Sequence, residues 1–241
     1  MNLGIRRNLR RWILKGNNVY CPCCKQSFAT FLPAGKPIRL NASCPFCGTV
    51  ERHRLIWLFL EQNPEKLLQV KLLHIAPEPP FFDSFKNRRD IHYFPADKFM
   101  KGHKYPSGTK HVDVMSINYP DNYFNAVICN HVLEHVSNDK QAMKEFFRVL
   151  KPGSWAILQV PIAYTNAETF EDSNITTPED REKYYGQNDH LRLFGRDYPE
   201  RLREAGFDVD CIDFVNAFSM EDRLRYGLDE KDGIIYLCKK N

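Results

Sequence analysis

Two pairs of cysteines constrain the fold of the first fifty residues more than any other feature of this chain of 241 residues. Cys21 and Cys24 form one C-x-x-C pair, Cys44 and Cys47 form a second, and 19 residues separate the pairs. Two thiolates spaced in this way can bind one tetrahedral ion from a single tight turn, and two such turns complete its coordination shell. The spacing is typical of a four-cysteine zinc site. We therefore predict one zinc ion, bound by Cys21, Cys24, Cys44 and Cys47.

Four thiolates leave no coordination position for water, so the predicted zinc is structural. The segment between the pairs combines scattered apolar residues with proline and glycine, a pattern that favours the short strands and turns of a zinc ribbon. Alternatives stay open at this stage. Cys23 could replace a neighbour as ligand, and iron could occupy a four-thiolate site. Disulfides are disfavoured in a reducing cytosol, and a redox C-x-x-C would need thioredoxin-like surroundings that the sequence lacks.

Basic residues are concentrated at the start of the chain. Residues 1–54 contain ten Lys or Arg and one acidic residue, which gives a formal charge of +9, whereas the whole chain carries +4. Such a block favours an anionic partner, namely nucleic acid, a phosphorylated substrate or an anionic lipid surface, and the alternative is a solvated arm. Attachment to an anionic membrane surface would use the apolar and arginine side chains of residues 3–15.

The chain lacks a transmembrane pattern. Its longest apolar run, residues 55–60, has six residues, whereas a bilayer requires about 20. Residues 12–14 are too short an apolar run for a secretory signal. We therefore expect a cytoplasmic protein.

Strand-like and helical segments alternate after residue 70, which predicts an α/β fold with a parallel sheet covered by helices on both faces. The predicted helices cover 51–62, 138–150 and 196–205. The seven predicted strands cover 71–75, 91–94, 111–114, 125–130, 154–160, 209–214 and 234–239. We expect a basic arm and zinc ribbon at 1–54 and a larger domain at 55–241. Within it, 55–70 would be a connector, and the polar segment 164–190 a lid or substrate loop.

Ligands bind beyond the carboxyl ends of strands in an open parallel sheet, so the residues at these ends are informative. They are residues 74–79, Asp97, Asp113 and the run Asn130-His131-Val132-Leu133-Glu134-His135.

From residue 71 to 239 the chain resembles the class I S-adenosylmethionine-dependent methyltransferases. The most specific part is residues 124–128, followed by Leu133-Glu134-His135 and the turn at 148–153. With the cysteine pairs, residues 51–54 and the loop at 74–79, the chain also looks like a zinc-ribbon-bearing subgroup of bacterial methyltransferases of largely unassigned substrate. This resemblance implies a seven-stranded Rossmann-like methyltransferase sheet with helices on both faces, a small N-terminal zinc-ribbon domain, and S-adenosylmethionine as cofactor.

The resemblance also implies residue roles. Asp97 would accept hydrogen bonds from the ribose hydroxyls, and Asp113 with Val114 would bind the adenine. Asn130 and His131 would face the methionine and sulfonium end.

The loop after the first predicted strand of the larger domain, residues 74–79, departs from the family pattern and is called the first loop below. His74 occupies the usual acidic position, and Ala76, Pro77 and Glu78 replace a glycine-rich turn, where proline also removes one N–H donor. Binding would then use the backbone of Ala76 and Glu78, with the Glu78 carboxylate facing the ammonium group.

Methyl transfer is an in-line displacement that depends on positioning, and an oxygen or nitrogen nucleophile benefits from a base such as histidine. The candidates are His131, His135 and His190. We predict that His190 lies on the substrate side, where Asp189 could orient a neighbouring base and Arg192 could bind an anionic group.

The leading hypothesis is methyl transfer to an O or N nucleophile of a small or carrier-linked acceptor, for which a glycan is one candidate. One alternative is an RNA methyltransferase that holds RNA with the basic zinc ribbon. The other is a degenerate, non-catalytic binding module, which the altered first loop suggests.

Overall fold

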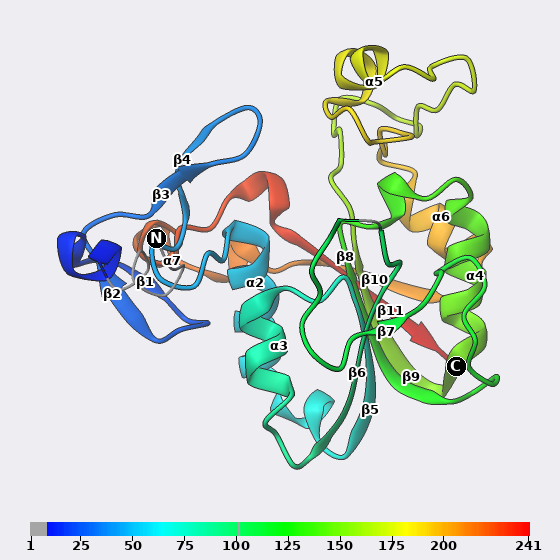
Figure 1. The fold of residues 1–241 in the computed structure, drawn as a ribbon, viewed down its shortest axis with the longest axis horizontal. Coiled ribbons are helices and arrows are strands. Elements are labelled where there is room, and N and C mark those ends of the chain that lie inside the picture. The colour runs from blue at the N-terminus through cyan, green and yellow to red at the C-terminus, as the bar shows by residue number, and fades with distance from the viewer. Residues whose placement is uncertain (1–8, 101) are drawn as a thin grey trace. The chain divides into compact units, whose positions relative to one another are not determined.

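The computed structural model describes residues 9–100 and 102–241, which form two compact units (Figure 1). Within the described residues, the first unit covers 9–67, 79–84 and 213–234, and the second covers 68–78, 85–100, 102–212 and 235–241. The start of the predicted basic arm, with Arg6 and Arg7, lies outside the described residues. The predicted domain boundary at residues 54 and 55 falls inside a helix of the first unit.

The first unit contains two small antiparallel sheets. β1 (Lys15–Cys21) pairs with β2 (Gln26–Phe28), and β3 (Leu32–Ala34) pairs with β4 (Arg39–Ser43). Their buried core contains only a few apolar side chains, with Cys21 and Cys44 among them. A core of this size gives little hydrophobic stabilisation, so a bound metal would supply much of the stability of this part.

The first unit also contains α2 (Glu51–Gln62), most of α3 (Pro79–Phe85), and α7 (Met220–Tyr226). The bounds of α2 are those predicted. Short 3-10 turns lie at Pro64–Leu67, Val215–Ala217 and Glu230–Asp232.

Arg54 of α2 is fully buried and connects distant parts of the first unit. Its guanidinium lies over the ring of Phe31, with Cζ 4.2 Å from the ring centroid. Its nitrogens donate hydrogen bonds of 2.6 to 2.9 Å to four backbone carbonyls, those of Ala42, Thr49, Tyr226 and Gly227. Because the last two acceptors are at the carboxyl end of α7, Arg54 also satisfies carbonyls that the helix leaves unpaired.

The second unit is built on one seven-stranded sheet with the order β10-β11-β9-β8-β5-β6-β7. The strands are β5 (Val70–Ile75), β6 (Ile91–Asp97), β7 (Lys110–His111), β8 (Phe124–Asn130), β9 (Leu150–Gln159), β10 (Asp208–Asp213) and β11 (Ile234–Lys240). The pairs β5/β6, β5/β8, β6/β7 and β8/β9 are parallel. The seven-stranded Rossmann-like sheet is thus confirmed.

Strand β11 runs antiparallel to β9, so the sheet is mixed rather than wholly parallel as the alternation of segments predicted. Between β10 and β11 the chain passes through residues 213–234 of the first unit.

Helices α4 (Asp139–Val149) and α6 (Tyr198–Glu204) lie on the same side of the sheet (Figure 1). Asn138 caps α4, since its side chain accepts a hydrogen bond of 3.0 Å from the backbone N–H of Gln141. Both helices lie inside their predicted ranges. Strand β7 is shorter than the predicted 111–114 because the chain turns there, with Asp113 bridged to Ser116.

The segment predicted as a lid or substrate loop, 164–190, carries helix α5 (Pro178–Tyr185) and extends away from the sheet (Figure 1). Single bridges pair Ile162 and Phe170 with Phe194 and Leu193, respectively. Its role as a lid stays a prediction. Across the described residues, no helix has both the length and the apolar character needed to cross a membrane.

Candidate functional site

A cavity of about 520 Å³ opens at the carboxyl ends of β5, β6 and β8. Strand β5 has β6 on one side and β8 on the other, so the strand order reverses at this point. Open α/β sheets bind their ligands at such a reversal, and this volume is within the range of small-molecule sites. The cavity is lined by Ile75, Ala76, Asp97, Lys98, Met100, Val112, Val114, Met115, His131, Val132, His135, Val136, Ser137, Asp189 and Leu191.

Two lining residues, Ala76 after β5 and His131 after β8, have left-handed backbone conformations, with φ of 49° and 54°. Non-glycine residues adopt this region at a cost of about 1–3 kcal/mol, and such strain often occurs at ligand sites. Neighbouring strands hold both positions, because the Ala76 N–H donates to the carbonyl of Ala96 and the His131 N–H to that of Gln159, each at 2.8 Å. The chain therefore turns sharply at both strand ends without glycine.

The altered first loop is organised around the carboxylate of Glu78. Its Oε2 lies 2.9 Å from Nε2 of His74, and its Oε1 accepts a hydrogen bond of 2.6 Å from Nδ2 of Asn130. His74 is fully buried, and its Nδ1 lies 2.9 Å from the hydroxyl of Tyr93. The sequence places His74 at the usual acidic position, and the structure brings in a carboxylate from four residues further along. His74, Pro77, Glu78 and Asn130 are not among the residues that line the cavity.

Asp97 and Asp113 differ in their surroundings. Asp97, the last residue of β6, lines the cavity, and burial raises the pKa of its carboxyl group. Asp113 accepts hydrogen bonds of 2.8 Å from Nζ of Lys98 and 2.9 Å from the backbone N–H of Met115, and the bond from Lys98 lowers its pKa. Asp113 does not line the cavity, whereas the adjacent Val114 does. Of these two carboxylates, only that of Asp97 belongs to a residue lining the cavity.

The candidate histidines surround a buried carboxylate, that of Glu134. This residue lies in the 3-10 turn Leu133–His135 and is 1% exposed. Nδ1 of His131 and Nε2 of His135 lie 3.4 and 4.0 Å from its Oε1. Burial disfavours ionisation of Glu134, but the contact and charge of His131 and the charge of His135 outweigh it, so its pKa is lowered. Sequence analysis did not identify Glu134 as the partner of these histidines. The spacing could have indicated it, because Glu134 comes three residues after His131 and directly before His135.

His190 lies beside His135, with ring centroids 4.8 Å apart, and is 4% exposed. Burial lowers its pKa, so neutral imidazole is favoured. It does not line the cavity, whereas His131 and His135 do.

The sequence suggested that Arg192 could bind an anionic group, but in the structure its donors already have partners within the protein. Its side chain is 3% exposed, and its guanidinium donates to the carbonyls of Leu133 and Val136 at 2.8 and 2.6 Å. It also contacts the carboxylates of Asp139 and Glu171. Its donors are therefore used to hold the turn after β8.

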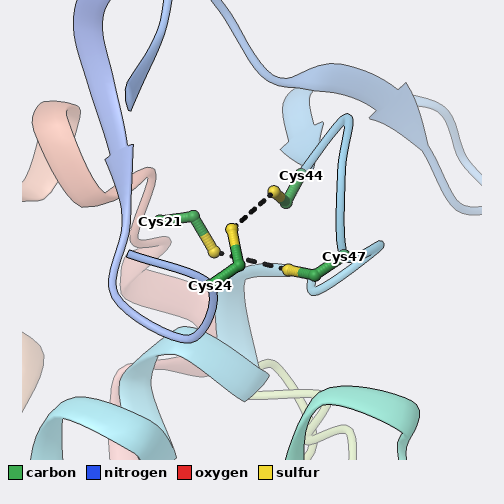
Figure 2. Close-up of side chains that lie close together, drawn as sticks. All are labelled: Cys21, Cys24, Cys44 and Cys47. Atoms are coloured by element: carbon green, nitrogen blue, oxygen red, sulfur yellow. Dashed lines mark hydrogen bonds between the residues drawn. The ribbon is translucent and has the colours of Figure 1, made fainter. Parts of the chain in front are cut away.

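The four predicted metal ligands come together, with their sulfur atoms within 4.8 Å of one another (Figure 2). Sγ of Cys21 lies 3.5 Å from that of Cys47, and Sγ of Cys24 lies 3.7 Å from that of Cys44. Sulfurs bound to one zinc ion at about 2.3 Å would lie about 3.8 Å apart in a regular tetrahedron. The donor set and its geometry therefore fit zinc.

The surroundings of the cluster also fit a metal site. The Thr49 hydroxyl lies 3.2 Å from Sγ of Cys21 and 3.1 Å from Sγ of Cys47, where it can donate to a thiolate. Cys23 is outside the group, and its Sγ lies 4.0 Å from the carbonyl of His53. None of the eight cysteines, all of which lie in the described residues, forms a disulfide.

Comparison with known proteins finds that residues 95–158 match a methyltransferase domain family. The chain is similar to a solved S-adenosylmethionine-dependent methyltransferase from Mesorhizobium loti, with 12% identity, 77% of this chain and 98% of that chain covered, and a TM-score of 0.53. It is also similar to YcgJ from Bacillus subtilis, with 15% identity, 78% and 99% covered, and a TM-score of 0.50. Comparison with curated protein sequences finds no match.

A third similar structure is the [4+2]-cyclase SpnF, with 18% identity, 76% of this chain and 80% of that chain covered, and a TM-score of 0.50. At these identities the structural likeness establishes the fold, which is that of the class I methyltransferases. The family match over residues 95–158 agrees with the methyltransferase resemblance seen in the sequence. Because a cyclase shares the fold, the reaction has to be argued from the site.

Proposed function

We propose that this protein is a cytoplasmic S-adenosylmethionine-dependent methyltransferase that acts on an O or N nucleophile of a small or carrier-linked acceptor. The observation that carries this proposal is the cavity at the reversal of strand order, which has the Asp97 carboxylate at the end of β6 and the sharp turn of Ala76 at the end of β5. A carboxylate at this place can accept two hydrogen bonds from a ribose diol. The sharp turn brings backbone close to the rest of the cofactor.

The remaining cofactor contacts would come from residues 112–114 and from the ends of β5 and β8. Val112 and Val114 offer apolar contact to an adenine ring. Asp113, which lies between them in the sequence and accepts a hydrogen bond from Lys98, would accept a hydrogen bond from the adenine amino group. Glu78 and Asn130 fix the end of β5 against the end of β8, where the methionine part would lie. Bound S-adenosylmethionine supplies a methyl group on a sulfonium, and the chain has to hold the acceptor atom in line with it.

His131 is the proposed general base because it lines the cavity and has a carboxylate behind it. Its Nδ1 lies 3.4 Å from Oε1 of Glu134, which leaves Nε2 as the nitrogen available to an acceptor. A carboxylate in this position orients an imidazole and stabilises its protonated form. His190, which the sequence placed on the substrate side, would act through His135, its ring neighbour.

The acceptor is proposed to be small or carrier-linked, and a glycan precursor is the candidate suggested by the family resemblance. RNA is the second candidate, and the charge of +9 on residues 1–54 supports it. Binding of RNA that weakens steeply with salt and disappears on removal of this charge would favour RNA. Absence of RNA binding at low salt would exclude it.

Calorimetric titration of the zinc-loaded protein with S-adenosylmethionine and S-adenosylhomocysteine tests the proposal. We expect micromolar binding that Asp97→Asn weakens at least about tenfold, since a neutral amide is a poorer acceptor for two hydroxyls. Asp208→Asn, at an exposed position at the start of β10, is the matched control. A folded wild-type chain that binds neither ligand would overturn the proposal in favour of a non-catalytic binding module.

A further inference from the structure

The carboxylate of Glu134 is buried without the hydrogen bonds that a buried charge requires. Among the residues that the structure describes, none donates a hydrogen bond of acceptable geometry to either of its oxygens. The nearest imidazole nitrogens, those of His131 and His135, lie 3.4 and 4.0 Å from its Oε1. A buried ionised carboxylate is costly unless it is paired or coordinates a metal. Because the contact with His131 is longer than a hydrogen bond, Glu134 can take a further ligand.

Two imidazoles complete a set of donors around this carboxylate. One ligand atom each from Glu134, His135 and His190 lies within 4.8 Å of the others. Nδ1 of His190 is buried and has no hydrogen-bond partner within residues 9–100 and 102–241. Two donors that bind one ion with bonds of about 2.1 Å lie at most about 4.2 Å apart. Nε2 of His135 and Oε1 of Glu134, at 4.0 Å, are too far apart for a hydrogen bond and within this limit.

The two nitrogens of His135 are oriented as in a metal ligand. Nε2 faces Glu134, whereas Nδ1 lies 3.4 Å from Oδ2 of Asp189 and 3.3 Å from its backbone carbonyl. Metal-bound imidazoles commonly donate their other N–H to a carboxylate or a carbonyl, which fixes the tautomer and the ring. Asp189 is thus placed to hold His135 with Nε2 free for the cluster.

We propose that Glu134, His135 and His190 bind one divalent first-row transition-metal ion, separate from the four-cysteine site. A donor set of one carboxylate and two imidazoles suits ions of this class and leaves coordination positions open. His135 and Asp189 line the cavity, so the open positions are available to a molecule bound there. If the proposed methyltransferase function holds, the ion would bind an oxygen of the acceptor and position it near His131.

Titration of the zinc-loaded wild-type protein with Co²⁺ tests the site. Cobalt in a site of nitrogen and oxygen donors gives ligand-field bands in the visible range without the intense thiolate-to-cobalt band that the cysteine site would produce. We expect one Co²⁺ per chain with such a spectrum. Absence of cobalt binding, or a spectrum that contains only the thiolate form, would overturn the proposal.

Variants assign the ligands. Glu134→Gln and His190→Gln should each lower the affinity for Co²⁺ at least about tenfold. Glu204→Gln and His92→Gln, at exposed positions outside the cluster, should leave it unchanged. Since loss of a buried ligand could disturb folding, Asp189→Asn at an exposed side chain gives an independent test and should lower the affinity several-fold. Affinity unchanged in Glu134→Gln and Asp189→Asn would overturn the assignment.

Cofactor titration of the same samples separates this inference from the proposed function. The Asp97→Asn variant should bind S-adenosylmethionine at least about tenfold more weakly and bind Co²⁺ with unchanged affinity. A wild-type chain that binds S-adenosylmethionine but no Co²⁺ contradicts only the metal site, and one that binds Co²⁺ but no S-adenosylmethionine contradicts only the methyltransferase function.

Discussion

Glu78 and Asn130 are joined by a hydrogen bond of 2.6 Å between Oε1 and Nδ2, which ties the loop after β5 to the last residue of β8. The second oxygen of Glu78 lies 2.9 Å from Nε2 of the buried His74. A loop that lacks the glycine-rich pattern of the family is therefore fixed by a carboxylate with a partner on each side. This bond holds together the two strand ends between which the strand order reverses.

Replacing Asn130 with alanine should weaken the binding of S-adenosylmethionine at least about tenfold and destabilise the fold by about 1.5–3 kcal/mol. The variant loses a partly buried hydrogen bond to a charged group, the bond from Nδ2 of Asn130 to Oε1 of Glu78. Calorimetric titration and urea unfolding measure the two effects. Asn17→Ala, at an exposed position of β1, is the control. Wild-type affinity in Asn130→Ala would show that the bond does not shape the cofactor site.

The sheet could be predicted from the sequence because its strands are local patterns of apolar residues between turns. The bounds of α2 and the number of strands followed from such patterns. The direction of β11 did not, because the connection from β10 passes through residues 213–234 of the other unit. Nor could the sequence reveal the contact of Arg54 with Gly227, which joins positions 173 residues apart.

The candidate site was predictable where one residue at a strand end faces the cavity, as Asp97, Ala76, Val114 and His131 do. Glu78 and Glu134 show the limit of this approach. The sequence suggested a carboxylate role for Glu78 but not its contacts with His74 and Asn130, and the burial of Glu134 depends on how the turn after β8 packs. A single sequence does not display such contacts between segments.

Arg54→Ala should destabilise the first unit by about 3 kcal/mol or more, because it leaves four backbone carbonyls without their donor in a buried place. Arg54→Lys should be nearly as damaging, since an ammonium group cannot reproduce the planar fork of five N–H donors. Urea unfolding at constant zinc concentration measures the loss. Arg225→Ala, at an exposed position of α7, should be nearly neutral, and equal stability of the Arg54 and Arg225 variants would contradict the role of Arg54.

Cys47→Ser should reduce the zinc content from one ion per chain to almost none, whereas Cys23→Ser should retain one. Sγ of Cys47 belongs to the group of four sulfurs, while Sγ of Cys23 faces the carbonyl of His53. Metal analysis of protein purified without added metal measures this difference. Removal of zinc by a chelator should also increase hydrogen exchange in β1 to β4, because their core is small. Loss of zinc from Cys23→Ser would show that the first pair of ligands is misassigned.

Glu145→Gln should lower stability at neutral pH and have less effect in acid. Nε and Nη2 of Arg148 donate to the two oxygens of Glu145 at 2.7 and 2.8 Å, and the backbone N–H of Ile117 donates to Oε2 at 2.7 Å. The bonds from Arg148 lower the pKa of Glu145 below its ordinary value of 4.5.

Because the folded pKa is depressed, the ionised carboxylate contributes its full stability above pH 4.5, and this contribution is lost as the pH falls through the folded value. The difference in unfolding free energy between wild type and Glu145→Gln should therefore be constant near pH 7 and shrink below pH 4.5. Urea unfolding between about pH 3 and 7 measures it, and the exposed Glu204→Gln should show a much smaller pH dependence. A difference that stays constant down to the lowest pH would mean that the Arg148 contact does not stabilise the ionised carboxylate.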